Sequence, residues 1–199
     1  MKGNQAEALA DDAVSYARLR AEYDRLHQEL LRAEWRIAEL EARADVDPLL
    51  DVLNRRGFER ELKRSLAYVA RYGTPGVLMF IDLDGFKAVN DRHGHAVGDK
   101  LLKAVAAELA SHVRASDVVG RLGGDEFGVV MWNIGAERAQ AKARELEAII
   151  EAANVAHGPL RLNVGASAGT VALDVALDAA DLIDAADRAM YARKRERRG

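Results

Sequence analysis

Two segments of this chain carry paired acids at positions where strands are expected to end. Residues 77–84 form an apolar run that closes on Asp82 and Asp84, and side chains at alternate strand positions share one face. Further along, apolar residues flank a Gly-Gly pair, which can take positive φ and predicts a β-hairpin turn that carries Asp125 and Glu126. Carboxylates brought together in this way suit Mg²⁺ with positions left open for phosphate oxygens, as phosphoryl transfer requires.

The hairpin turn alone has two interpretations. Gly-Gly-Asp is also an ordinary turn sequence with no catalytic role. The upstream acids favour the metal-binding interpretation, because hard oxygen ligands from two separate segments would then converge on one site.

Both segments resemble the signature motifs of one family. Residues 123–127 have the sequence Gly-Gly-Asp-Glu-Phe, and residues 80–99 are similar to the upstream motif, with Phe-Ile-Asp-Leu-Asp-Gly-Phe-Lys followed by Asn-Asp and a Gly-His pair. Over roughly residues 47–198 the chain resembles the GGDEF-domain diguanylate cyclases. The resemblance implies that two GTP molecules condense into cyclic di-GMP with release of two pyrophosphates. The alternatives are a non-catalytic module that binds GTP or cyclic di-GMP, and a coiled-coil interaction protein on a catalytic fold that has lost its activity.

The resemblance also implies roles for the acids. Asp82 and Asp125 would be side-chain ligands of two Mg²⁺ ions, with Mn²⁺ as a possible substitute, and the carbonyl of Leu83 would be a further ligand. Asp125 and Glu126 would serve catalysis, Asp125 by helping to deprotonate the attacking 3′-hydroxyl and Glu126 by supporting the metals. For Asp84, a turn-capping role and a direct role are equally open.

Guanine recognition is implied for three residues that follow the first acidic segment. Asp99 can accept both adjacent N–H donors of guanine and Asn90 can satisfy its acceptor edge, with His95 lining the same pocket. The residue types alone leave another interpretation open, in which Asp99 is a helix N-cap and Asn90 ends a helical turn.

Phosphate binding is implied for cationic side chains and backbone donors. Lys87, Lys194 and Arg198 match positions that hold phosphates in relatives, and the substrate site would also include Phe86, through the backbone N–H groups around it, and Gly124. For Lys194 and Arg198 the alternative is a solvated basic tail.

An Arg-x-x-Asp sequence precedes the hairpin. Arg114 and Asp117 have the spacing of the family's product-inhibition site, at which cyclic di-GMP would bind. Ion pairing or helix capping explains most such pairs in proteins generally. Arg71 and Arg144 are candidates for a second arginine from a neighbouring domain.

The N-terminal part has the pattern of a coiled coil. Residues 9–44 contain neither Pro nor Gly, and apolar residues recur in alternating steps of three and four. Heptad positions a and d are filled by Tyr16, Leu19, Tyr23, Leu26, Leu30, Ala33, Ile37, Leu40 and Ala44. We therefore expect residues 1–44 to be a dimerising stalk and residues 45–199 to be the catalytic domain, and the alternative is a single amphipathic helix packed on its own domain.

Hydrophobic periodicity predicts the elements of the second part. Expected helices cover residues 58–72, 100–113, 137–153 and 181–195, and expected strands cover 77–83, 118–122, 127–132 and, as one bent strand or two, 160–173; residues 94–99 are expected to be a loop. Strands that alternate with helices around a central hairpin predict an α/β fold, an α+β sandwich that resembles the ferredoxin-like palm of nucleotide cyclases.

Charge and composition limit the kinds of binding partner and metal site that this protein is expected to have. A net charge of −3 gives no reason to expect nucleic acid or an anionic membrane as a partner, and the absence of cysteine excludes disulfides and thiolate metal sites. No apolar run approaches the length of a membrane span, and the first residues have no signal-peptide core. We expect a cytoplasmic protein.

Overall fold

The computed structural model describes residues 18–33, 35–36, 45–158 and 160–198, with side chains described through residue 195. It divides into two compact units, Met1–Arg43 and Ala44–Gly199. Among the helices that the structure describes, none combines the length and the apolar character that a membrane crossing requires.

The described part of the first unit is helical over residues 18–33 and 35–36. Five predicted seam residues have exposed side chains in the single chain, namely Leu19, Tyr23, Leu26, Leu30 and Ala33. Seam positions that lie outside the described residues are Tyr16, Ile37, Leu40 and Ala44. The helix is present as expected, and its pairing with a second chain stays a prediction.

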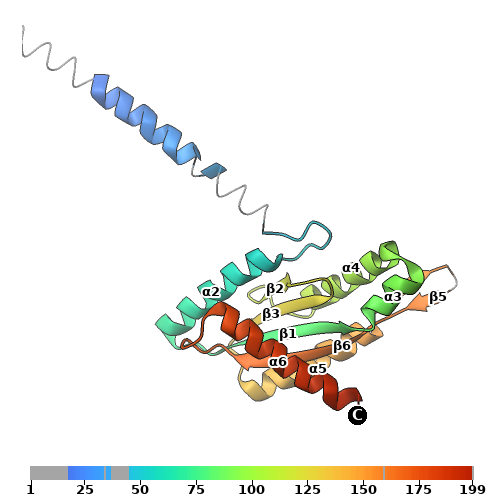
Figure 1. The fold of residues 1–199 in the computed structure, drawn as a ribbon. Helices are drawn as coiled ribbons and strands as arrows, with labels where there is room; N and C mark the ends of the chain where they lie inside the picture. The colour runs from blue at the N-terminus through green and yellow to red at the C-terminus, as the bar shows by residue number, and fades with distance from the viewer. Residues whose placement is uncertain (1–17, 34, 37–44, 159, 199) are drawn as a thin grey trace, which may run out of the picture. The chain divides into compact units, whose positions relative to one another are not determined.

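The second unit is a mixed helix and sheet domain (Figure 1). Its elements in chain order are α2 (Arg55–Tyr72), β1 (Gly76–Asp84), α3 (Phe86–His93), α4 (His95–Ser111), β2 (Val118–Arg121), β3 (Glu126–Trp132), α5 (Ala136–Ala152), β4 (Val155–His157), β5 (Leu160–Leu162), β6 (Gly165–Ala172) and α6 (Ala179–Arg198). The main sheet has the order β2-β3-β1-β6 with antiparallel neighbours, and β4 pairs with β5 in a separate hairpin. Apart from that hairpin, this is the predicted ferredoxin-like α+β sandwich.

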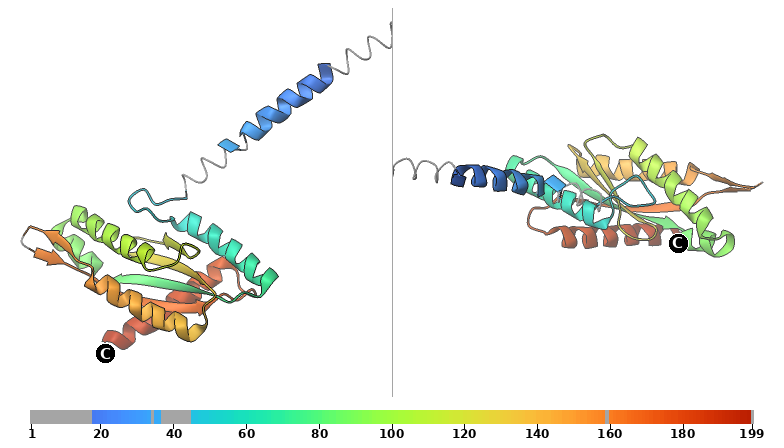
Figure 2. Two further views of the ribbon diagram at one scale, coloured as in Figure 1. Left: turned by 180° about the vertical axis from the view of Figure 1, so that it is seen from behind. Right: turned by 90° about the horizontal axis from the view of Figure 1, so that it is seen from above.

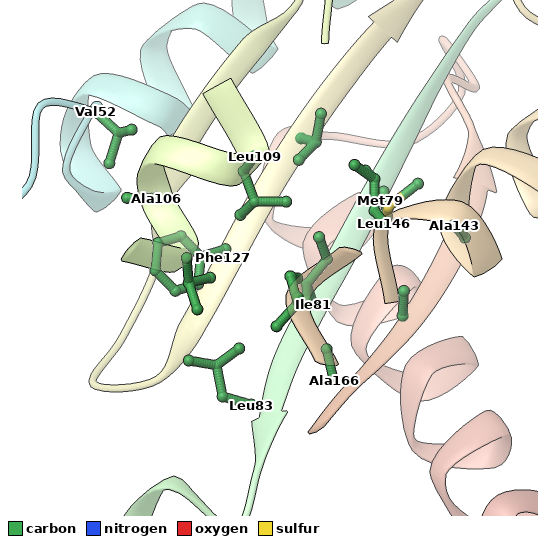
Figure 3. Packing of buried hydrophobic residues seen from close by; sticks show 14 of the residues in the cluster. Val52, Met79, Ile81, Leu83, Ala106, Leu109, Phe127, Ala143, Leu146 and Ala166 are labelled. Carbon is green, nitrogen blue, oxygen red and sulfur yellow. The ribbon is translucent and has the colours of Figure 1, made fainter. Parts of the chain in front are cut away.

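Alternate residues of the central strand β1 face two separate cores. Met79 and Ile81 belong to a cluster with α4 and α5, whereas Leu78 and Phe80 belong to a cluster with α2 and α6. The sheet is therefore covered on both faces, as the two views of Figure 2 show. Figure 3 shows the first cluster, in which Phe127 of β3 lies beside α4.

The predicted loop at residues 94–99 is wrong. Gly94 takes φ +82, and its N–H ends α3 by donating to the carbonyl of Asn90 at 2.8 Å. The carbonyl of Gly94 then accepts from the N–H of Val97 at 3.1 Å and so begins α4. A single residue thus separates two helices, and the polar, glycine-containing sequence forms a helix–helix corner.

Other boundaries differ in smaller ways. Helix α2 begins before the expected residue 58 because the side chain of Asn54 accepts from the N–H of Gly57 at 3.0 Å and caps it. The segment 160–173 contains two strands, β5 and β6, and the short strand β4 was not expected. The remaining predicted strands and helices are confirmed to within a few residues.

The segment before α2 belongs to the domain. Leu53 donates to the carbonyl of Val119 at 3.2 Å and accepts from the N–H of Arg121 at 2.7 Å, so this segment lies along the edge strand β2. Asp45 is almost fully buried and forms ion pairs with Arg56, at 2.8 Å, and with Arg60. These contacts fix the start of the described domain to α2 and to the sheet edge.

Candidate active site

The acids of the two segments meet at one end of the sheet. Asp82 and Glu126 are direct partners in the antiparallel register of β1 and β3. Just beyond them, the N–H of Leu83 donates to the carbonyl of Asp125 at 3.1 Å. The structure therefore brings together the residues that the sequence analysis assigned to metal binding and catalysis.

Positive φ does not account for the two glycines of the hairpin turn. Neither Gly123 nor Gly124 has positive φ, so that part of the prediction is wrong. A Cβ on Gly123 would overlap the carboxylate at the flexible end of the Glu126 side chain, which can move aside, so close approach does not require this glycine either. The surroundings of Gly124 are open, because no other residue lies within 4 Å of the position that a Cβ would take, so this exposed residue leaves room for a ligand.

Arg121 holds the turn, although the sequence analysis did not single it out. Its guanidinium donates to the carbonyl of Gly123 at 3.0 Å and to that of Gly124 at 2.8 Å. It also reaches Asp47 at 3.2 Å, and the other carboxylate oxygen of Asp47 accepts from the N–H groups of Leu49 and Leu50. The segment before α2 is thus linked to the turn that carries Asp125. Its place next to the Gly-Gly pair was the only sequence signal for Arg121.

Lys194 of α6 lies on the acids of β1. Its ammonium contacts the carboxylate of Asp82 and lies 3.0 Å from that of Asp84. The hydroxyl of Ser167 donates to the other oxygen of Asp84 at 2.8 Å. Asp84 is therefore held by β6 and α6, and Lys194 belongs to the site and not to a solvated tail.

The three predicted guanine-binding residues lie around the corner between α3 and α4. Asp99 is exposed within α4, whose N-cap is Gly94, so the N-cap interpretation of Asp99 is wrong. The side chain of Asn90 lies against Gly98, where a Cβ would overlap it. Its Oδ1 is buried there without a hydrogen-bond partner among the described residues, and the donor that the acceptor edge of guanine requires is the other amide atom, Nδ2. His95 is exposed at the start of α4.

The other predicted substrate residues differ in how far they are described. Phe86 is buried and begins α3 directly after Gly85, which has φ +79. Lys87 is exposed on the first turn of the same helix. Helix α6 runs through Arg198, whose side chain lies outside the described part, so its phosphate-binding role stays a prediction.

Comparison with known protein families identifies the family to which this domain belongs. The family described as "Diguanylate cyclase, GGDEF domain" matches residues 44–199. This chain belongs to the GGDEF diguanylate cyclase family. The match begins where the second compact unit begins, and it includes every acid of the site.

Relatives support this assignment. The GGDEF chain is 41% identical over 177 residues to the probable diguanylate cyclase DgcE of Escherichia coli (strain K12), covering 86% of this chain and 16% of DgcE. It is 38% identical over 169 residues to the diguanylate cyclase TpbB of Pseudomonas aeruginosa, covering 81% of this chain and 38% of TpbB. The chain thus spans less than half the length of these curated relatives.

Solved structures share the fold of the GGDEF domain. The GGDEF domain of DgcB from Caulobacter crescentus, in complex with c-di-GMP, superposes with a TM-score of 0.72 at 26% identity, covering 77% of this chain and 91% of that domain. A sensory box/GGDEF family protein from the same organism is 35% identical, with a TM-score of 0.69, covering 76% of this chain and 99% of that one.

The Arg-x-x-Asp pair of this GGDEF domain lies away from the acids, beside the start of β2. Both carboxylate oxygens of Asp117 accept backbone N–H groups, from Arg114 at 2.9 Å and from Trp132 at 3.2 Å. The side chain of Arg114 is exposed, and a cavity of about 330 Å³ beside it is lined in part by Lys142. Asp117 therefore shapes the loop, as the capping interpretation expects, and Arg114 faces open space.

Two acids of this GGDEF domain, Asp125 and Glu126, have raised pKa values. Burial, followed by the negative charge of Asp82, raises the pKa of Asp125. Burial, followed by the charges of Asp125 and Asp187, raises the pKa of Glu126. Burial lowers the pKa of Lys194, but hydrogen bonds and attraction from Asp82 and Asp84 outweigh it, so that pKa is raised. The site gathers more negative charge than Lys194 alone compensates, which suits a further cation.

A divalent metal ion fits this donor set. Among the described residues, no three His, Cys, Asp or Glu side chains already form a metal cage. Mg²⁺ does not require one, because it usually takes one or two carboxylates and fills its other positions with water and substrate phosphates. Asp82, Asp125 and the carbonyl of Leu83 offer oxygens of that kind at adjoining positions of the sheet end.

The raised pKa of Asp125 predicts a pH-dependent effect on stability. A carboxyl whose pKa is raised by folding favours the folded state below its ordinary pKa of 3.8, and this contribution is lost as pH rises through the folded-state pKa. We expect metal-free Asp125→Asn to unfold at a higher temperature than wild type at pH 7, with the difference closing as pH falls toward about 4.

Thermal unfolding in the presence of a chelator measures this effect. Asp91→Asn, which changes an exposed acid of α3, is the control and should unfold like wild type at every pH. A melting temperature of Asp125→Asn that equals or falls below that of wild type at pH 7 would contradict the electrostatic account.

Proposed function

We propose that this GGDEF domain is a diguanylate cyclase, which condenses two GTP molecules into cyclic di-GMP and two pyrophosphates. The observation that carries the proposal is the meeting of Asp82, Asp125 and Glu126 beside Lys194 in a domain that matches the family over residues 44–199. It is supported by relatives named as diguanylate cyclases and by the DgcB domain solved with c-di-GMP.

In the proposed reaction, the 3′-oxygen of one GTP attacks the α-phosphorus of the other, and the bond to pyrophosphate breaks. Asp82, Asp125 and the carbonyl of Leu83 would hold Mg²⁺ or Mn²⁺, which supplies charge neutralisation at the phosphate oxygens. Asp125 would also help to deprotonate the attacking hydroxyl. Glu126 would support the metal ions from the adjoining position.

Substrate binding would use the two regions that flank the acids. Lys87, Lys194 and Arg198 neutralise the triphosphate, and the backbone around Phe86 and Gly124 leaves room for it. Guanine would be bound at the corner of α3 and α4 by the residues predicted for it, Asn90, His95 and Asp99. The proposal draws support from the exposed position of Asp99, which has no capping role in α4, and from the place of Asn90 at the same corner, where its Nδ2 is the donor suited to the acceptor edge of guanine.

The reaction requires two domains, because the product is two-fold symmetric and each domain would bind one GTP. We propose that residues 1–44 of two chains pair as a parallel coiled coil and so bring two catalytic domains together. This pairing raises the effective concentration of one active site near the other. The exposed seam residues Leu19, Tyr23, Leu26 and Leu30 support this proposal, because a partner helix would bury them.

Product feedback is proposed for the Arg-x-x-Asp pair. The exposed guanidinium of Arg114 beside a cavity of about 330 Å³ is suited to guanine or phosphate of cyclic di-GMP. Asp117 would act chiefly by fixing the loop, since backbone N–H groups already occupy its oxygens.

The turnover of GTP tests the activity and the feedback together. Purified wild type with GTP and Mg²⁺ should form cyclic di-GMP, and Asp125→Asn should lower the rate by about 10²-fold or more because a metal ligand is lost. Arg114→Ala should keep the initial rate and continue past the product concentration at which wild type stops. Product formation no faster than that of Asp125→Asn would refute the proposed activity, and tight binding of cyclic di-GMP by such a silent wild type would favour the binding-module alternative.

Neighbouring leucines of the stalk test dimerisation. Leu30 occupies a seam position and Leu31 does not, although both side chains are exposed in the single chain. Leu30→Glu should shift the protein from dimer to monomer in light scattering and lower turnover roughly tenfold or more at micromolar protein, whereas Leu31→Glu should retain both properties. Equal dimerisation of the two variants would contradict the proposed seam.

A further inference from the structure

Lys194 reaches the acids because α6 lies directly on the sheet. A Cβ on Gly169 of β6 would overlap backbone atoms of Ala186 and Met190, so the helix approaches the strand as closely as a glycine allows. Ala186 and Met190 are buried on this face. Residues four apart share one face of a helix, so Lys194 comes next along the same line and projects over the end of β1.

The ammonium of Lys194 lies at both carboxylates of β1. It contacts Asp82, lies 3.0 Å from Asp84, and is only 17% exposed. The carboxylates are likewise mostly shielded, at 20% and 26% exposure. Attraction between charges shielded in this way is screened much less than at the surface, so the ammonium competes effectively with any other cation at Asp82.

We propose that Lys194 is the counter-ion of the metal-free site, and that it makes metal binding depend on the nucleotide. An ion that binds Asp82 has to displace this ammonium. The triphosphate offers Lys194 other anionic oxygens, so that nucleotide binding draws it away from Asp82 and frees that carboxylate for the metal. The inference rests on the proposed function, because it takes a nucleoside triphosphate as the second partner of Lys194.

A counter-ion role and a phosphate-binding role of Lys194 predict different metal binding by the protein without nucleotide. If Lys194 only bound phosphate, its removal would weaken nucleotide binding and leave metal binding without nucleotide unchanged. If it also occupies the acids, its removal strengthens metal binding in the absence of nucleotide. By linkage, the metal and the nucleotide then strengthen each other's binding in wild type, and this coupling depends on Lys194.

Mn²⁺ binding to the full chain, followed by the electron paramagnetic resonance signal of the free ion, tests the proposal. Titrations are made without nucleotide and with a GTP analogue whose α–β bridging oxygen is a methylene, which cannot release pyrophosphate, and the analogue-only titration is subtracted. Without nucleotide, we expect Lys194→Met to bind Mn²⁺ about tenfold more tightly than wild type does. We expect the analogue to raise the Mn²⁺ affinity of wild type about tenfold and that of the variant far less.

Lys87→Met is the matched control. Lys87 is the other described lysine assigned to the triphosphate, but it is exposed on α3, and the ion pairs described for Asp82 and Asp84 are those with Lys194. Its removal should leave Mn²⁺ binding without nucleotide at the wild-type value. Circular dichroism establishes that each variant is folded, and Lys194→Gln takes the place of Lys194→Met should that variant unfold.

The outcomes separate this inference from the proposed function. The inference is overturned if the folded Lys194 variant, measured without nucleotide, binds Mn²⁺ no more tightly than wild type does. This holds even where wild type makes cyclic di-GMP. Tighter Mn²⁺ binding by the Lys194 variant, with Lys87→Met unchanged, supports the inference even where wild type shows no turnover, and in that case only the proposed function fails.

Discussion

The antiparallel pairing of β1 with β3 is the constraint on which the site depends. It sets Asp82 opposite Glu126 and joins Leu83 to the carbonyl of Asp125, so that like charges are held together by backbone hydrogen bonds. Burial, followed by repulsion from the neighbouring carboxylate of Asp82, raises the pKa of Asp125. The buried sheet, covered on both faces, holds the acids in an arrangement that their own charges oppose.

Cationic side chains from distant parts of the chain balance this charge. Lys194 enters from the last helix and contacts Asp82, and Arg121 fixes the carbonyls of the turn. Arg121 also binds Asp47, so its guanidinium adds to the backbone hydrogen bonds of Leu53 in tying the segment before α2 to the hairpin. An active turn anchored in this way is preorganised, which is what catalysis by positioning and charge neutralisation requires.

Sequence patterns predicted those elements whose signals are local. The apolar run before Asp82 and the hairpin around Gly123 have the periodicity of strands, and both were placed correctly. The corner at Gly94 was missed, because one glycine with positive φ ends a helix and begins the next within a sequence that resembles a loop. The pairing of Arg121 with Asp47 depends on tertiary packing, as does the contact of Lys194 with Asp82, and no spacing along the chain encodes either contact.

The central claim is that acids of two segments bind shared metal beside a nucleotide's phosphates. The most direct test is a crystal structure of the protein with Mn²⁺ and the non-reactive GTP analogue, with the metal located by anomalous scattering. The account predicts anomalous density between Asp82 and Asp125, within coordination distance of the carbonyl of Leu83. Nucleotide bound with Mn²⁺ away from both carboxylates, or with Asp125 turned out of the metal's coordination sphere, would contradict it.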